Sequence, residues 1–222
     1  DYTTATAAMK DVYAKMRENG VLTGKTSGTS REMGLYTDEM KWYGSSTSTA
    51  NNFYNNTVLP SIGTIANWWN FSYSQIYGAN AIINGVAAST ALKQEDKDQL
   101  TGEAKFVRGM LHFYLLQLYG AVPFITSTDY KVNSKVGRMP EAEVYQKIVA
   151  DLESASSLLK ADYENPERVR PNSYVAKALL ARVYLYQGAY AEASNSASAV
   201  LNATDLYALP DDLNSVFLKE SS

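Results

Sequence analysis

The sequence predicts an all-α protein built from tetratricopeptide-like helical hairpins that are joined by long ordered loops. Apolar residues recur at three- and four-residue steps over several long stretches, which is the spacing of one helix face. Glycine, proline or asparagine bounds most of these stretches, and one of them resembles a tetratricopeptide signature. With 222 residues, 45% of them apolar, the chain is long enough to enclose a hydrophobic core.

The first helix is predicted from Ala5 to Met16, ending near Gly20, because ATAAMKDVYAKM has helical spacing and few helix breakers. Residues 21–40 are rich in Gly, Ser and Thr, so we expect them to be mostly loop. Residues 42–61 combine glycine and proline with clustered Asn, Ser and Thr, and should form an ordered loop as well.

Two long helices are predicted next. One runs from Ile65 to about Val86, where apolar and aromatic residues share one face. The other runs from Gln94 to Tyr119, begins with acidic residues and stops at Gly120. Its expected inward face consists of Leu100, Ala104, Val107, Leu111, Leu115 and Leu118.

A crossing loop, residues 121–138, separates these helices from the C-terminal ones. Met139-Pro140-Glu141 opens the next helix, with proline in the first turn, where its missing N–H costs nothing. Asn172 should cap a helical hairpin over residues 174–201 that matches most positions of a tetratricopeptide repeat. Ala197 and Asp205 depart from that signature, which has an aromatic residue and a proline at these positions.

Composition excludes several classes of function. The chain has no cysteine and one histidine, which excludes disulfide scaffolds, zinc fingers, cysteine nucleophiles and His-rich metal sites, and we expect no cofactor. The formal charge of −3 argues against nucleic acid as a partner. No apolar run approaches the roughly 20 residues that span a membrane, so membrane attachment is expected only through a lipid anchor outside this chain.

No catalytic pattern stands out, and we expect the chain not to be an enzyme. GKTSGTS from Gly24 resembles a phosphate-binding loop, but Gly20 lies one residue too close to it. The acidic pairs are sequence neighbours, a poor arrangement for two carboxylates that must face each other across a cleft. His112, between Leu111 and Phe113 in a helix, is expected to be a packing residue.

The most informative stretch of the sequence contains no charged residues. Residues 42–92 contain no Asp, Glu, Lys or Arg, yet hold all three tryptophans, six further aromatic residues and eight asparagines. Aromatic faces stack on the C–H faces of sugars, and carboxamides both donate to and accept from hydroxyl groups. The sequence therefore predicts a site for a neutral glycan at Trp42, Tyr43, Asn52, Phe53 and Tyr54, with Asp38 and Arg31 as weaker neighbours.

Two alternatives stay open for these rings. They could instead seal the loop onto the helices, and for Trp69 and Tyr73, at helical spacing, burial is the favoured interpretation. A peptide would also suit stacking and amide bonding, so the ligand class is not fixed by these residues alone.

Four segments of the chain resemble the SusD/RagB family of Bacteroidetes outer-membrane lipoproteins. They are WNFSYSQIYGANAII from Trp69, EAKFVRGMLHFYLLQLYGAVPFI from Glu103, RMPEAEVYQKIVADLESASSLL from Arg138 and RPNSYVAKALLARVYLYQGAYAEAS from Arg170. Together they extend the resemblance over residues 33–217. Family members are about twice as long, so residues 1–222 are expected to form the N-terminal helical region of such a protein, with the C-terminal half absent.

The resemblance implies a non-catalytic, lipid-anchored protein on the outer surface of the outer membrane. Such a protein binds an oligosaccharide, such as a starch-like glycan, through aromatic and polar loop residues and delivers it to a TonB-dependent, SusC-like transporter. The competing hypothesis is a tetratricopeptide-type scaffold that holds another protein, or a peptide-uptake protein, and binds no sugar.

Overall fold

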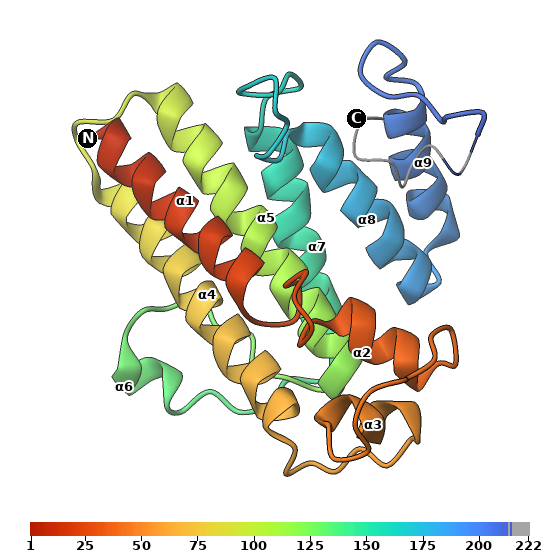
Figure 1. Ribbon diagram of the computed structural model, residues 1–222. Coiled ribbons are helices and arrows are strands. Elements are labelled where there is room, and N and C mark those ends of the chain that lie inside the picture. The colour runs from red at the N-terminus through yellow and green to blue at the C-terminus, as the bar shows by residue number, and fades with distance from the viewer. Residues whose placement is uncertain (213, 215–222) are drawn as a thin grey trace.

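The computed structural model describes residues 1–212 and 214, and the regular structure of this part of the chain is helical throughout (Figure 1). The all-α prediction is confirmed. The remaining residues of the expected 1–222 unit, 213 and 215–222, lie outside the described part. The helices are α1 (Tyr2–Glu18), α2 (Thr29–Tyr36), α3 (Thr49–Tyr54), α4 (Gly63–Ala88), α5 (Gln94–Tyr119), α6 (Tyr130–Asn133), α7 (Glu141–Leu158), α8 (Ser173–Gln187) and α9 (Tyr190–Leu201).

Helix α5 is the centre of the bundle. It packs against α4 on one side and α7 on the other, while α1 covers α4 and α5 (Figure 1). Helices α8 and α9 extend the array from α7 as an antiparallel hairpin. The short helices α2 and α3 lie together near the start of α4, and α6 lies apart from them on the other side of α4 (Figure 1).

Local sequence signals explain where the long helices stop and start. Gly120 ends α5 with a φ of +66°, a left-handed value that glycine adopts without a steric penalty. The side chain of Asn172 accepts a hydrogen bond from the Val175 N–H, so the predicted cap of α8 is confirmed. Pro140 lies just before α7 rather than in its first turn, a small correction to the prediction.

Residues 21–40 are mostly loop as expected, with α2 within them, and the short helices α3 and α6 interrupt segments that were expected to be loop throughout. Each is short enough that propensity alone would not hold it, so packing and capping fix it. In α3, the Ser48 hydroxyl accepts from the Ala50 N–H, and Ala50 and Phe53 are buried three residues apart on one face. Asp129 caps α6 in the same way through the Lys131 N–H.

The core follows the predicted helix faces. Every residue of the expected inward face of α5 is buried except Leu118, which is partly buried and packs against the core. No helix among the described residues has both the length and the apolar content needed to cross a membrane.

Two buried ion pairs fasten α5 to its neighbours. Arg108 makes two 2.7 Å hydrogen bonds to the Asp151 carboxylate of α7 and a third to the Asn80 carboxamide of α4. Glu103, fully buried, accepts from Arg170 and from the Tyr13 hydroxyl of α1 at 2.7 Å. Because removing one partner of such a pair leaves a buried charge uncompensated, both pairs fix how the helices pack around α5.

Candidate functional site

The best-formed part of the predicted site is the turn after α2 that carries Trp42 and Tyr43. The Trp42 indole donates a 3.0 Å hydrogen bond to the Ser45 carbonyl, which holds the ring in place. The ring lies so close to Gly44 that a Cβ atom there would be 2.3 Å from it, so only glycine fits. Tyr43 is 89% exposed, and Trp42 is half-buried with part of its surface in solvent.

Arg31 of α2 completes this surface. Its guanidinium carbon lies 5.8 Å from the centre of the Trp42 ring, within cation–π range. The same guanidinium group pairs with the buried carboxylate of Glu32 at 2.5 Å. Since this ion pair balances the charge, Arg31 adds a hydrogen-bond donor to the surface without making it cationic. We call Arg31, Trp42 and Tyr43 the Trp42 surface.

Phe53 is not part of an exposed site, and the prediction for this residue was wrong. Its side chain is 1% exposed, and its ring lies 5.7 Å from that of Trp68 in the core. The i, i+3 spacing that buries Ala50 turns the Phe53 ring inward in the same way. The Phe53 ring therefore cannot stack on a ligand in this structure.

The other predicted residues lie nearby but are not tied to Trp42. Asn52 and Tyr54 are half-buried on α3, and Asp38 is exposed beyond α2 with a left-handed φ of +64°. Among the described residues, no hydrogen bond, ion pair or ring contact joins any of the three to Trp42. Of the seven predicted residues, the structure thus joins Arg31 and Trp42 by a contact, and Tyr43 is next to Trp42 through the chain alone.

Sequence reasoning missed a second aromatic surface, on α4. Trp69 and Tyr73 are partly buried and pack against the core as expected, whereas Tyr77 is 53% exposed. The three rings, four residues apart, line a cavity of about 270 Å³. The crossing loop supplies its other walls, through Pro123, Ile125, Asn133 and Val136. The sequence did contain a signal for this surface, because Tyr77 follows Trp69 and Tyr73 at the same four-residue spacing and so lies on the same helix face.

His112 anchors the crossing loop that walls this cavity. Its Nε2 accepts from the Ile125 N–H at 3.2 Å and its Nδ1 lies 2.9 Å from the Arg108 carbonyl, so the neutral ring with a proton on Nδ1 satisfies both partners. Burial lowers the His112 pKa to about 3, because a charged imidazolium would lose its hydration there. The predicted packing role of His112 is confirmed.

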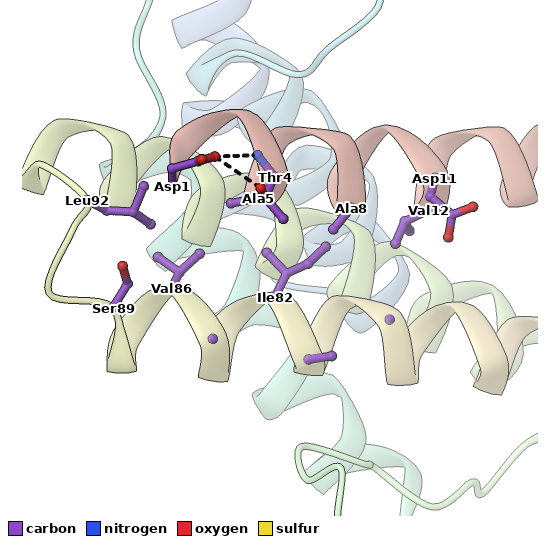
Figure 2. Close-up of a pocket in the computed structure, with 13 residues that line it drawn as sticks. Asp1, Thr4, Ala5, Ala8, Asp11, Val12, Ile82, Val86, Ser89 and Leu92 are labelled. Atoms are coloured by element: carbon purple, nitrogen blue, oxygen red, sulfur yellow. Dashed lines mark hydrogen bonds between the residues drawn. The ribbon is translucent and has the colours of Figure 1, made fainter.

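Another cavity, of about 360 Å³, lies between α1 and the C-terminal half of α4 (Figure 2). Its walls are alanine, valine, isoleucine and glycine, and it has no aromatic lining residue. The Asp1 carboxylate at its rim is occupied in capping α1 through Thr4, and Asp11 pairs with Lys15. This cavity lacks the stacking faces and free amides that sugar recognition needs.

Comparison with known proteins places the chain among carbohydrate-binding relatives. The family model described as "SusD-like: starch-binding associating with outer membrane" matches residues 4–185. A SusD-like protein P2 of Formosa agariphila is 30% identical over 157 residues, which cover 68% of this chain and 29% of the relative. A SusD-like protein of Bacteroides ovatus is 32% identical over 120 residues, 53% of this chain and 21% of the relative.

Solved structures agree with the sequence matches. A laminarin-binding SusD-like protein superposes with a TM-score of 0.78 and 28% identity, over 89% of this chain and 43% of that one. A SusD superfamily protein of Parabacteroides distasonis superposes with a TM-score of 0.79 and 27% sequence identity. The match covers 96% of this chain and 47% of that one. The chain thus spans less than half the length of these proteins. The family is described by binding rather than by a reaction, in line with the expectation that this is not an enzyme.

Proposed function

The chain belongs to the SusD-like family, and on that premise we propose that it binds an oligosaccharide, without catalysing any reaction, at the Trp42 surface. It acts at the outer surface of the outer membrane, attached through a lipid anchor outside this chain, and hands the oligosaccharide to a TonB-dependent transporter. The observation that carries the proposal is the pair of rings at Trp42 and Tyr43, one fixed and one fully open to solvent.

The chemistry of the Trp42 surface suits a neutral sugar. The Trp42 indole is already fixed before a ligand binds and offers it an apolar face. Because the ring does not have to be ordered on binding, the entropic cost of association is reduced. Tyr43 adds a second face with a hydroxyl group, and Arg31 adds donors that its pairing with Glu32 leaves without net charge. Asp38, Asn52 and Tyr54 are proposed as flanking contacts for sugar hydroxyl groups.

Calorimetric titration tests this assignment, with laminari-oligosaccharides and malto-oligosaccharides as probes. The first probe follows from the laminarin-binding relative and the second from the family description. We expect a Trp42→Ala/Tyr43→Ala variant to bind about tenfold or more weakly, from the loss of two stacking faces. Tyr130→Ala is the matched control, since Tyr130 is 80% exposed and lies on α6.

Equal affinity in the double variant and the wild type would remove the Trp42 surface as the site. Tyr54→Ala and Asn52→Ala should have smaller effects, because both side chains are half-buried on α3. Delivery to a transporter is tested separately, by co-purification of a TonB-dependent outer-membrane protein with the native protein.

The α8–α9 hairpin favours a second function, the holding of a partner protein. Leu185, Tyr186, Tyr190 and Leu201 are each more than half exposed on this hairpin, an arrangement typical of contact surfaces. A protein that used only this surface would co-purify with its partner and give no calorimetric response to either glycan probe.

A further inference from the structure

The aromatic face of α4 forms a cavity that is separate from the Trp42 surface. The residues that line it are Trp69, Tyr73, Tyr77, Pro123, Ile125, Asn133 and Val136, and none of them belongs to the Trp42 surface. At about 270 Å³ it lies just below the roughly 300–1,000 Å³ of pockets that enclose drug-sized ligands, so it has room for one ring-sized group.

The Trp69 ring is held by its neighbours on the bundle side. Its centre lies 4.8 Å from that of Tyr73 and 5.1 Å from that of Tyr119, the latter in an edge-on contact at 84°. The Tyr119 hydroxyl donates to the Ile65 carbonyl at 2.6 Å, which fixes that support in turn. An indole braced in this way keeps its orientation whether or not a ligand is present.

The wall opposite the rings is equally well anchored. Tyr73 donates a 2.7 Å hydrogen bond to the Pro123 carbonyl, and the Asn80 carboxamide donates to the Ile125 carbonyl at 3.0 Å. The Ile125 N–H donates to His112. Because these bonds join the crossing loop to both α4 and α5, the cavity exists in the protein without a ligand.

Several polar atoms around the cavity are left for a ligand. Within the described residues, the Trp69 indole N–H and the Tyr77 hydroxyl have no hydrogen-bond partner. The Asn133 carboxamide donates to the Ser127 carbonyl at 2.8 Å, which leaves its oxygen available as an acceptor. No acidic or basic residue lines the cavity, so apolar faces with a few uncharged donors and acceptors are its whole chemistry.

A neighbouring cavity of about 310 Å³ shares Trp69 and would extend such a site. Asn70, Tyr119 and Arg138 are among its lining residues, and no carboxylate is. An oligomer with one ring in the first cavity therefore has space and further hydrogen-bond donors for the next ring in this neighbouring cavity.

We propose that the cavity walled by Trp69, Tyr73 and Tyr77 is a second sugar-ring site, which binds one uncharged pyranose ring of an oligosaccharide. It relies on the proposed function only for the class of ligand, since no residue of the Trp42 surface contributes to it. Two separate sites on one chain would grip an oligosaccharide at two points, or bind two chains of a polysaccharide, and so raise its apparent affinity.

Indole resonances provide a test that reads the two sites separately. In ¹⁵N-labelled protein each tryptophan gives one indole N–H signal, which a Trp→Phe variant assigns. On titration with laminarihexaose and maltohexaose to millimolar concentration, we expect the Trp69 signal to shift with at least one probe. The Trp68 signal should stay still, because its indole is buried and donates to the Ser27 carbonyl at 2.7 Å.

Variants then link the shift to the cavity. Tyr77→Ala should weaken the binding reported by Trp69 by about three- to tenfold, the range for loss of one aromatic contact. Tyr130→Ala, an exposed tyrosine outside the cavity, should not change it.

The outcomes separate this site from the proposed function. A Trp69 signal that shifts while Trp42 does not supports the second site and contradicts the Trp42 assignment. If Trp42 shifts and Trp69 does not, the second site is overturned and the proposed function stands. If neither indole signal shifts, both the second site and the Trp42 assignment are overturned. If the Trp69 signal shifts equally in the Tyr77→Ala variant, the cavity is not the cause of the shift, and the second site is overturned.

Discussion

Trp42 donates its indole hydrogen bond to Ser45, three residues away, whereas Trp68 donates to Ser27, 41 residues away. The same contrast holds for the carboxamides in the two halves of the charge-free stretch. Asn51 bonds to the nearby Ser46 carbonyl, while Asn80 joins the crossing loop to Arg108 of α5. In residues 42–61 these groups make short-range contacts that shape a local surface, and in α4 Trp68 and Asn80 make long-range contacts that hold the bundle together. Residues of the same types therefore differ in the range of their contacts.

The largest effect expected from this contrast is on Trp68. Trp68→Ala should lower the free energy of unfolding by about 3–5 kcal/mol, because it removes a buried ring that packs on Phe53. Trp42→Ala, at a half-exposed ring with a local bond, should cost about 1 kcal/mol or less. Urea unfolding of the two variants measures this, and equal losses would contradict the division between the halves.

The next effect concerns the carboxamides of α4. Asn80→Ala leaves the Arg108 Nη1 group and the Ile125 carbonyl without their partner, which should cost about 1–3 kcal/mol of unfolding free energy. Asn84→Ala, on the exposed side of the same helix, serves as control and should change stability by no more than about 0.5 kcal/mol. A cost in the control as large as at Asn80 would show that the loss does not come from the Asn80 hydrogen bonds, and helix propensity could not explain it because alanine is the better helix former.

A pH dependence of stability should come from His112 in the bundle. The native His112 pKa is lowered to about 3 from an unfolded value near 6.5, so between these limits the unfolded chain binds the extra proton. The histidine contribution to stability is therefore complete above pH 6.5 and is lost as the pH falls, by about 1 kcal/mol from pH 6.5 to 5.5.

Comparison with His112→Gln isolates this effect. Unfolding free energies of the variant should depend less steeply on pH over that interval, whatever its absolute stability. Identical slopes for variant and wild type would mean that His112 does not stay neutral in the folded protein.

The smallest stability effect is expected at Gly44. A methyl group there would overlap the Trp42 ring, so Gly44→Ala should displace the ring and weaken oligosaccharide binding several-fold. Because the turn is exposed, unfolding free energy should change by only about 0.5 kcal/mol. Gly24→Ala is the matched control, since a Cβ at that exposed position meets nothing within 4 Å. Unchanged affinity in Gly44→Ala would argue that the ring position is unimportant for binding.

The long helices could be predicted from the sequence because their apolar period persists over many turns. The segment from Gln94 to Tyr119 was predicted with the ends that the structure shows, since acidic residues mark its start and Gly120 its stop. The short helices α2 and α3 were missed, because Gly, Ser, Thr and Asn favour loops locally and only packing against the bundle makes these residues helical.

The residue types of the candidate site could be predicted from the sequence, but the directions in which their side chains point could not. The sequence NNFYNN does not indicate which ring faces inward, and the structure buries Phe53 fully and Tyr54 only partly. Likewise, burial was favoured for Trp69 and Tyr73, yet the crossing loop leaves a cavity over them that depends on hydrogen bonds between distant residues. Such long-range contacts have no signature within a local stretch of sequence.

Thermal unfolding with and without laminarihexaose tests most directly the claim that the Trp42 surface binds the ligand without holding the fold. A ligand that binds only the native state stabilises it by about 2.7 kcal/mol when present at a hundred times its Kd. We predict that Trp42→Ala/Tyr43→Ala unfolds near the wild-type temperature without ligand and loses most of the rise in Tm that the oligosaccharide gives the wild type. A double variant that keeps the full ligand-induced rise, or one that is already strongly destabilised without ligand, would contradict the account.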